Sequence, residues 1–175
     1  MKRPLLTACL LLTAVVPLVG QGGGDEQRLK AAFVFRFPQF VVWPPAAVTG
    51  RNTLEICADA RGGATAALRE ITAGESLNGK PLVVRDIPAA RDLASCHVLV
   101  LTGNQPEREL MVRAATLPIL TVGDSDAFLD NGGIIQLKTV DRRVRFEIDL
   151  RAAARAGITL SSQLLRLAAN VRGER

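Results

Sequence analysis

The sequence predicts a three-layer α/β/α sandwich whose mostly parallel sheet of about six strands includes an antiparallel C-terminal hairpin. Short apolar runs, of the kind found in strands buried on both faces, alternate with helical segments along most of the chain. Near the C-terminus, two strand-like segments at 134–140 and 144–150 are joined around Asp141-Arg142-Arg143, which indicates a hairpin. Strands that alternate with helices and then close in a hairpin are typical of this fold class.

The N-terminus has the pattern of a secretory signal peptide. Two basic residues precede an apolar run from Leu5 to Val19, and a short tract of glycines follows. A basic start, a short apolar stretch and small residues at its end are typical of a segment that is removed during export. We therefore expect residues 1–22 to be cleaved and residues 25–175 to form a single α/β domain.

The segment 25–42 is predicted to be the first helix. Its apolar residues recur at helical spacing, namely Leu29, Phe33, Phe37 and Phe40. Pro38 should kink or shorten this helix because it lacks a backbone donor, and Trp43-Pro44-Pro45 should end it. Most of the aromatic residues of the chain lie in this segment, so it is expected to anchor either the core or a partner.

The rest of the chain alternates between the two element types. Strands are expected at 53–58, 81–86, 96–102 and 118–122, with helices at 64–71 and 106–115 and a turn at Asn78-Gly79. A last helix is predicted across 152–171, with a break near Gly157 and a cap at Thr159 or Ser161. Its apolar stripe consists of Leu160, Leu164, Leu167 and Val171. A stripe of this kind serves equally to cover a core or to bind a partner.

The residues that carry chemistry are few. His97 is the single histidine, and no CxxC or HxxxH spacing occurs, so we expect no metal site. Gly123-Asp124-Ser125 resembles the start of one esterase motif, but no histidine follows Ser125 to act as its base. We therefore expect no catalytic residues, no cofactor and no enzymatic activity. The net charge of +5 comes from scattered basic residues, and it does not indicate a nucleic-acid partner in an exported protein.

Two cysteines remain once the signal peptide is removed, Cys57 and Cys96. An even number of cysteines in an exported protein predicts one disulfide bond. In two parallel strands in register, these residues would lie about 10 Å apart along the strand direction. A disulfide needs Cα atoms within about 7 Å, so the second strand must be staggered or approached by an extended segment.

Read in order, several segments of the mature chain resemble the YfiR family of exported α/β proteins. They are the helix ending in Phe37-Pro38-Gln39-Phe40-Val41-Val42-Trp43-Pro44, the strand with Ile56-Cys57, Cys96-His97-Val98-Leu99, Leu120-Thr121-Val122, Phe128 with Gly132-Gly133, Val144-Arg145-Phe146-Glu147-Ile148-Asp149 and the closing Gly157-Ile158-Thr159-Leu160-Ser161-Ser162-Gln163-Leu164-Leu165-Arg166-Leu167-Ala168. The match runs in the same order over nearly all of the mature chain.

The resemblance implies a periplasmic regulator without catalytic activity. Such a protein binds and represses the periplasmic sensor region of an inner-membrane diguanylate cyclase, or another membrane sensor, and so modulates cyclic-di-GMP signalling and biofilm formation. An outer-membrane lipoprotein can sequester it, and a homodimer is left open. The apolar helices supply the candidate partner-binding residues, which are Arg36, Phe40, Trp43, Leu160, Leu164 and Arg166.

An alternative function is a periplasmic small-ligand-binding sensor module that resembles one lobe of a solute-binding protein. In a parallel sheet, ligands bind at the carboxyl ends of the strands. The loops that follow three predicted strands would then form the crevice, at 59–63, 102–105 and 123–126.

Overall fold

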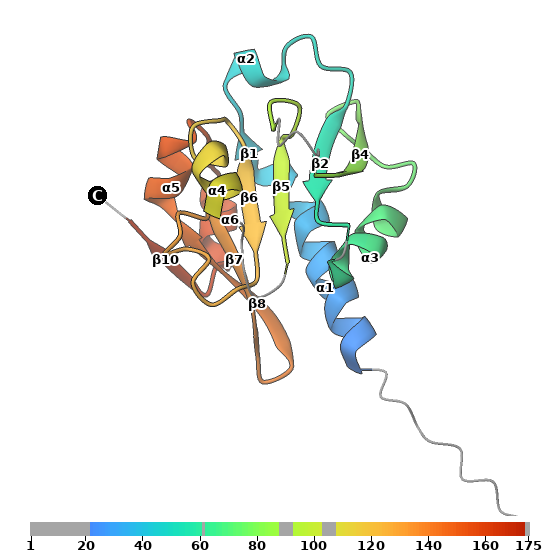
Figure 1. Ribbon diagram of the computed structural model, residues 1–175, viewed down its shortest axis with the longest axis vertical. Coiled ribbons are helices and arrows are strands. Elements are labelled where there is room, and N and C mark those ends of the chain that lie inside the picture. Colours follow the sequence, from blue (N-terminus) through green and yellow to red (C-terminus); the bar gives the residue numbers. More distant parts are fainter. Residues whose placement is uncertain (1–21, 61, 88–92, 103–107, 174–175) are drawn as a thin grey trace, which may run out of the picture.

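The computed structural model describes residues 22–60, 62–87, 93–102 and 108–173 (Figure 1). Within these residues one eight-stranded sheet has the strand order β10-β8-β7-β6-β5-β2-β4-β3. Its strands are β2 (Leu54–Ala58), β3 (Ser76–Leu77), β4 (Lys80–Asp86), β5 (Val98–Leu101), β6 (Leu120–Gly123), β7 (Ile135–Val140), β8 (Arg143–Asp149) and β10 (Asn170–Arg172). Only the β7–β8 and β3–β4 pairs are antiparallel among these described strands, so the predicted mixed, mostly parallel fold is confirmed.

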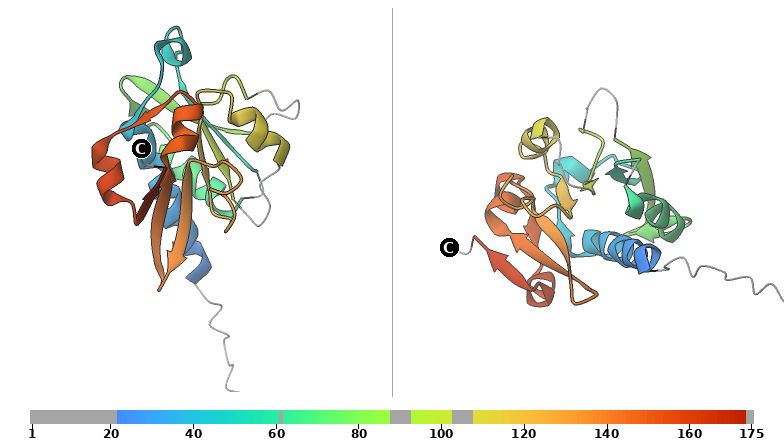
Figure 2. Two further views of the ribbon diagram at one scale, coloured as in Figure 1. Left: turned by 90° about the vertical axis from the view of Figure 1, so that its left-hand side faces the viewer. Right: turned by 60° about the horizontal axis from the view of Figure 1, so that its bottom comes forward.

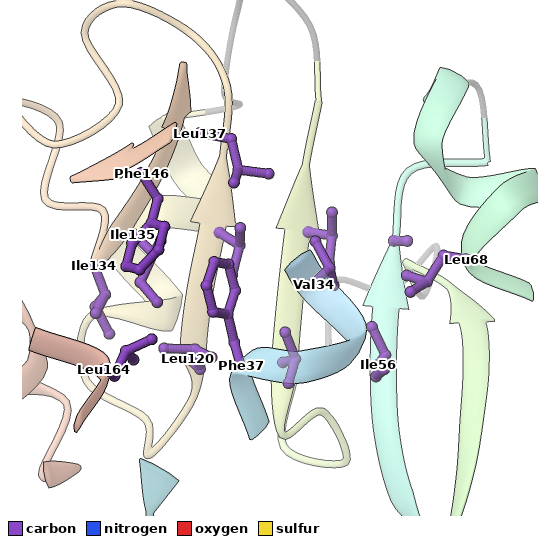
Figure 3. Close-up of a cluster of buried hydrophobic side chains, with 14 of the residues drawn as sticks. Val34, Phe37, Ile56, Leu68, Leu120, Ile134, Ile135, Leu137, Phe146 and Leu164 are labelled. Carbon is purple, nitrogen blue, oxygen red and sulfur yellow. The ribbon is translucent and has the colours of Figure 1, made fainter. Parts of the chain in front are cut away.

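Helices cover both faces of this sheet (Figure 2). They are α1 (Gly22–Arg36), the 3-10 helix η1 (Phe37–Phe40), α2 (Pro45–Val48), α3 (Gly63–Thr72), α4 (Arg108–Ala114), α5 (Leu150–Arg155) and α6 (Ser162–Leu167). The cluster on one face contains Val34 of α1 and Leu68 of α3 (Figure 3), and the cluster on the other contains Met111 of α4. Because strand side chains alternate, Ile56 joins the first cluster and Cys57 the second.

The N-terminal segment is helical over a shorter range than 25–42. α1 ends at Arg36, and the chain continues as η1 and then as the short strand β1 (Val41–Val42). The predicted effect of Pro38 is confirmed, since this residue cannot donate the backbone bond that would continue the α-helix. The expectation of helix at 41–42 is wrong, because these two valines pair antiparallel with β9 (Thr159–Leu160).

The C-terminal segment 152–171 is not one interrupted helix, as its periodicity suggested. It contains the end of α5, then β9, α6 and most of β10. The predicted cap at Ser161 is confirmed, because its Oγ accepts a hydrogen bond from the amide of Leu164 at 3.3 Å. Val171, expected on the helical stripe, instead lies in β10 opposite Ile148, so the β7–β8 hairpin is not the edge of the sheet.

Two short strands account for the difference between about six predicted strands and eight observed ones. One is β10 and the other is β3, which pairs with β4 across the predicted turn at Asn78-Gly79. Residues 1–21 of the predicted signal peptide lie outside the described residues, and Gly22 is the first residue of α1. The start of the 106–115 helix also lies outside them, and α4 agrees with the remainder of that helix.

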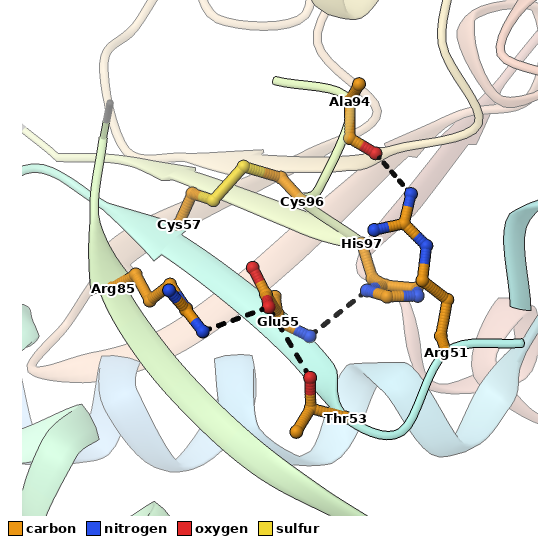
Figure 4. The surroundings of a disulfide bond; sticks show 8 residues. All are labelled: Arg51, Thr53, Glu55, Cys57, Arg85, Ala94, Cys96 and His97. Atoms are coloured by element: carbon orange, nitrogen blue, oxygen red, sulfur yellow. Dashed lines mark hydrogen bonds and ion pairs between the residues drawn. A yellow bond between two sulfur atoms is a disulfide. The ribbon is translucent and has the colours of Figure 1, made fainter. Parts of the chain in front are cut away.

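The predicted Cys57–Cys96 disulfide is confirmed, with the two Cα atoms 5.7 Å apart (Figure 4). Cys57 lies opposite Leu99 in the parallel β2–β5 pair, so a straight β5 would have carried Cys96 too far along the strand. A turn precedes β5 instead, and in it the amide of Cys96 donates to the carbonyl of Leu93 at 2.9 Å. This turn folds Cys96 back over Cys57, and both are buried in the α4-side cluster.

Replacing both Cys57 and Cys96 with alanine should lower the free energy of unfolding by about 4 kcal/mol, because the bond closes a long loop in the unfolded chain. The sequence separation of the two residues is 39. Denaturant unfolding of the oxidised wild type and the double variant measures the difference. Reduced wild type is the control and should lose a similar amount. A loss below about 1 kcal/mol would show that the bond adds little to stability.

Candidate functional site

An apolar groove of about 450 Å³ lies between α1, η1 and α6, above β8. Its lining is almost entirely hydrocarbon, and it consists of Leu29, Ala32, Phe33, Arg36, Phe37, Gln39, Phe40, Phe146, Leu164 and Leu167. These residues come from the two ends of the described chain and from the hairpin strand β8. The groove is therefore a product of tertiary packing.

Packed aromatic rings form the floor of the groove. The ring of Phe37 meets that of Phe146 edge to face at a centroid distance of 5.2 Å. Phe33 completes the cluster, with its ring centroid 6.0 Å from Phe37 and 5.8 Å from Phe146. Leu164 is buried beside them (Figure 3). Such ring pairs resist rearrangement, so the floor is preformed.

The rim of the groove leaves large aliphatic side chains in solvent. Leu29 on α1 is 45% exposed and Leu167 on α6 is 63% exposed. Exposed polar side chains at Arg36 and Gln39 lie beside them. The guanidinium of Arg36 lies 5.1 Å from the ring centroid of Phe35, a residue outside the groove lining. An apolar surface with a few polar side chains at its edge is typical of a protein-binding surface.

A pair of two-residue strands brings the walls of the groove together. Val41 in β1 lies opposite Leu160 in β9, and the amide of Ser161 donates to the carbonyl of Phe40 at 2.9 Å. Because β1 directly follows η1 and β9 directly precedes the cap of α6, this pairing places η1 beside α6. Two segments that are distant in the sequence thereby form one surface.

The structure brings together only part of the predicted partner-binding set. Arg36, Phe40 and Leu164 line the groove, although Leu164 is only 1% exposed. Arg166 is exposed on α6, where it donates to Ser162 at 3.4 Å, and it does not line the groove. Leu160 is buried by the β1–β9 pairing.

Several groove residues lie outside the partner-binding set that the sequence predicts. Leu29 and Leu167 lie on the apolar stripes of the two predicted helices, so the stripes could have indicated them. Gln39 and Phe146 carry no such signal, because nothing local to either residue places it beside α6.

Trp43, the remaining predicted partner-binding residue, lies against His97 rather than in the groove. Their rings are nearly perpendicular, with centroids 6.1 Å apart. The Nδ1 of His97 accepts the backbone amide of Glu55 at 3.1 Å (Figure 4). Burial and, next in size, the positive charge of Arg51 lower the pKa of His97. His97 is therefore a neutral structural residue that joins β2 to the start of β5.

The loops predicted for a ligand crevice are only partly described, because residues 61 and 103–105 lie outside the described ranges. At this edge the Nζ of Lys30 on α1 contacts Asp124 at 2.8 Å and Glu26 at 2.9 Å. Burial lowers the pKa of Lys30, but the bonds to Asp124 and Glu26 outweigh it, so the net shift is upward. This ion pair attaches α1 to the end of β6.

The described residues contain neither a candidate metal centre nor a candidate membrane-spanning helix. No cluster of three or more His, Cys, Asp or Glu side chains is arranged to hold a metal ion in the part of the chain that the structure describes. Among the same residues, no helix is both long and apolar enough to cross a membrane.

The fold and the groove define a mixed α/β protein with a preformed apolar surface at the junction of its two ends. The family described as YfiR/HmsC-like matches residues 27–169, and the chain belongs to this family. YfiR-like proteins are periplasmic and generally have regulatory rather than catalytic roles.

A solved structure with some similarity is the conserved domain protein of Vibrio cholerae O1 biovar El Tor. The two are 12% identical with a TM-score of 0.49, and the match covers 83% of this chain and 60% of that one. No curated protein matches the sequence.

The lowered pKa of His97 predicts a pH dependence of stability. At pH values between the pKa of His97 in the folded protein and its value of about 6.5 in the unfolded chain, the unfolded chain binds more protons than the folded protein. The contribution of neutral His97 is therefore complete above that unfolded value and is lost as the pH falls through this range. Replacement by asparagine removes the titration but retains a side-chain acceptor for the amide of Glu55.

Thermal unfolding of the wild type and the His97→Asn variant between about pH 7 and pH 5 measures this effect. The wild type should lose stability relative to the variant as the pH falls. Because His97 is the single histidine, no other imidazole contributes to the difference. Parallel pH profiles for the two proteins would contradict the prediction.

Proposed function

We propose that this protein is a non-enzymatic periplasmic regulator that binds the sensor region of an inner-membrane diguanylate cyclase through the apolar groove and represses the enzyme. Family membership supports the class of partner. The observation that carries the proposal is the groove itself, where Leu29 and Leu167 remain in solvent beside a packed aromatic floor. Exposed aliphatic side chains around a preformed apolar hollow favour a protein partner.

The chemistry of the lining fits a protein better than a small polar ligand. Small-molecule sites are mostly apolar too, but they contain a few polar groups placed to orient the ligand. In this groove the polar side chains, Arg36 and Gln39, lie at the exposed rim. An apolar side chain of the sensor would enter between Phe33 and Leu167, and an acidic neighbour would pair with Arg36.

Repression then follows from differential binding. A regulator that binds the inactive conformation of the sensor more tightly than the active one shifts the cyclase towards inactivity and lowers cyclic-di-GMP. An outer-membrane lipoprotein that bound the same groove would compete with the cyclase and release it. The regulator performs no chemistry in this scheme, in agreement with the buried, structural position of His97.

One observation favours the alternative, a small-ligand sensor module. Among the residues that the structure describes, the buried hydroxyl oxygens of Thr102 and Ser125 have no hydrogen-bond partner, and both residues follow parallel strands at the carboxyl edge of the sheet. Unpaired buried hydroxyls are costly unless something binds them. A metabolite that raised the melting temperature equally in the wild type and in groove variants would support this second function.

Replacing Leu167 with glutamate should abolish binding to the sensor region. The side chain is 63% exposed, so the fold should tolerate the change, whereas an interface would bury an unpaired carboxylate. Isothermal titration with the purified periplasmic domain of the cyclase should show affinity reduced by about a hundredfold or more.

Val112→Glu is the matched control, because Val112 on α4 is also 63% exposed but lies on the opposite face of the sheet. This variant should bind normally. Equal binding by both variants, or equal loss in both, would exclude the groove as the binding surface.

In cells, deletion of the gene should raise cyclic-di-GMP because the cyclase is no longer repressed. The wild-type gene should restore the level, and the Leu167→Glu variant should fail to do so while accumulating normally. Unchanged cyclic-di-GMP after deletion, with no membrane cyclase co-purifying with the tagged protein, would overturn the proposed function.

A further inference from the structure

The β7–β8 hairpin projects beyond the rest of the sheet (Figures 1 and 2). One contact near its tip attaches it to the start of α1, where Thr139 donates to Glu26 at 2.8 Å. Val140, at the end of β7, leaves 49% of its surface in solvent. The tip is therefore a convex, accessible feature that the groove does not include.

The turn at this tip has an unfavourable sequence for its conformation. Asp141 and Arg142 both have left-handed backbone angles, with φ of 50° and 59°. Two consecutive residues of this kind are typical of a type I′ turn, which strongly prefers Asn-Gly or Asp-Gly. Arginine at the second position is strained because its Cβ crowds the backbone.

The strands next to the turn contain a second unfavourable feature. Lys138 and Arg145 lie directly opposite one another in the antiparallel register, where like charges repel. Glu147 compensates Lys138 at 2.9 Å. Arg145 has no carboxylate partner among the residues that the structure describes. The left-handed backbone at Arg142 and the like-charge pair of Lys138 and Arg145 both destabilise the hairpin, and both place a cationic side chain in solvent. Two destabilising features of this kind in one hairpin indicate a role other than stability.

The strand period separates the two faces of the hairpin. Val144 and Phe146 are buried towards the α1 side, so Arg143 and Arg145 lie on the other face and are exposed. With Arg142 in the turn, three exposed arginines gather around the apolar side chain of Val140. No ion pair to these three is present within the described ranges 22–60, 62–87, 93–102 and 108–173.

We propose that this tip docks on an anionic phospholipid surface, with Arg142, Arg143 and Arg145 on lipid phosphates and Val140 at the boundary of headgroups and acyl chains. Arginine matches phosphate because its planar fork can donate two parallel hydrogen bonds. A projecting tip reaches a broad, flat surface, and basic residues around an apolar one are typical of interfacial binding.

Membrane docking goes beyond the proposed function, and it does not depend on the groove. A few arginines give weak, reversible attachment. That attachment would concentrate the regulator near any membrane-embedded partner and so strengthen a second contact without new protein contacts. The groove and the tip would then act as the two halves of a bivalent interaction.

Vesicle sedimentation tests the proposal, using protein purified from the periplasm of expressing cells. The wild type should sediment with vesicles of equal parts phosphatidylcholine and phosphatidylglycerol, but not with phosphatidylcholine alone. Added salt should weaken the binding by screening. The double variant Arg143→Gln/Arg145→Gln should lose on the order of twentyfold in partition, because each basic residue near an anionic surface contributes about fivefold.

The matched control is Arg151→Gln/Arg155→Gln, which removes the same charge from exposed positions on α5 and should sediment like the wild type. A further variant, Arg142→Gly, separates lipid binding from folding. It creates the favoured Asp-Gly turn, so it should raise the melting temperature while weakening vesicle binding.

Three results would each overturn the proposal. They are failure of the wild type to bind phosphatidylglycerol vesicles, equal loss in the α5 control, and an Arg142→Gly protein that is more stable yet binds vesicles as before. Hairpin-dependent retention on immobilised polyglutamate without vesicle binding would also overturn it, and would replace the bilayer with an acidic protein partner.

Discussion

The contact between Phe37 and Phe146 is the interaction on which most of the described structure depends. Phe37 begins the 3-10 helix that follows α1 and is 1% exposed, and its ring meets that of Phe146 in the C-terminal hairpin edge to face. This contact closes the core on one face of the sheet and also forms the floor of the groove. The same packing that stabilises the fold thus creates the surface proposed to bind the partner.

Strand β8 serves both proposed surfaces because its side chains alternate. Phe146 points to the groove side, whereas Arg145 points to the opposite face of the hairpin. A one-residue change in the register of this strand would exchange the side chains on its two faces, and it would remove both surfaces at once. The antiparallel pairing of β8 with β7 and its parallel pairing with β10 hold that register.

The disulfide and His97 stabilise a different part of the molecule. Cys57–Cys96 and the His97–Glu55 hydrogen bond both join β2 to the start of β5. The bonded sulfurs lie in the cluster on the α4 side of the sheet, away from the aromatic floor of the groove. Loss of the disulfide or of the His97–Glu55 hydrogen bond should therefore lower the stability of the fold without altering the groove.

The sequence alone determined features that depend on local pattern or on composition. The apolar runs identified β5 and β6, the cysteine count identified Cys57–Cys96, and Ser161 was one of two candidate caps. Tertiary structure decided the rest. Val41 became a strand residue because Leu160, far along the chain, lies opposite it. Leu29 and Leu164 both lie on apolar helical stripes, yet Leu29 is 45% exposed and Leu164 is 1% exposed. The reason is that an apolar stripe shows the period of a helix but does not show what packs against it.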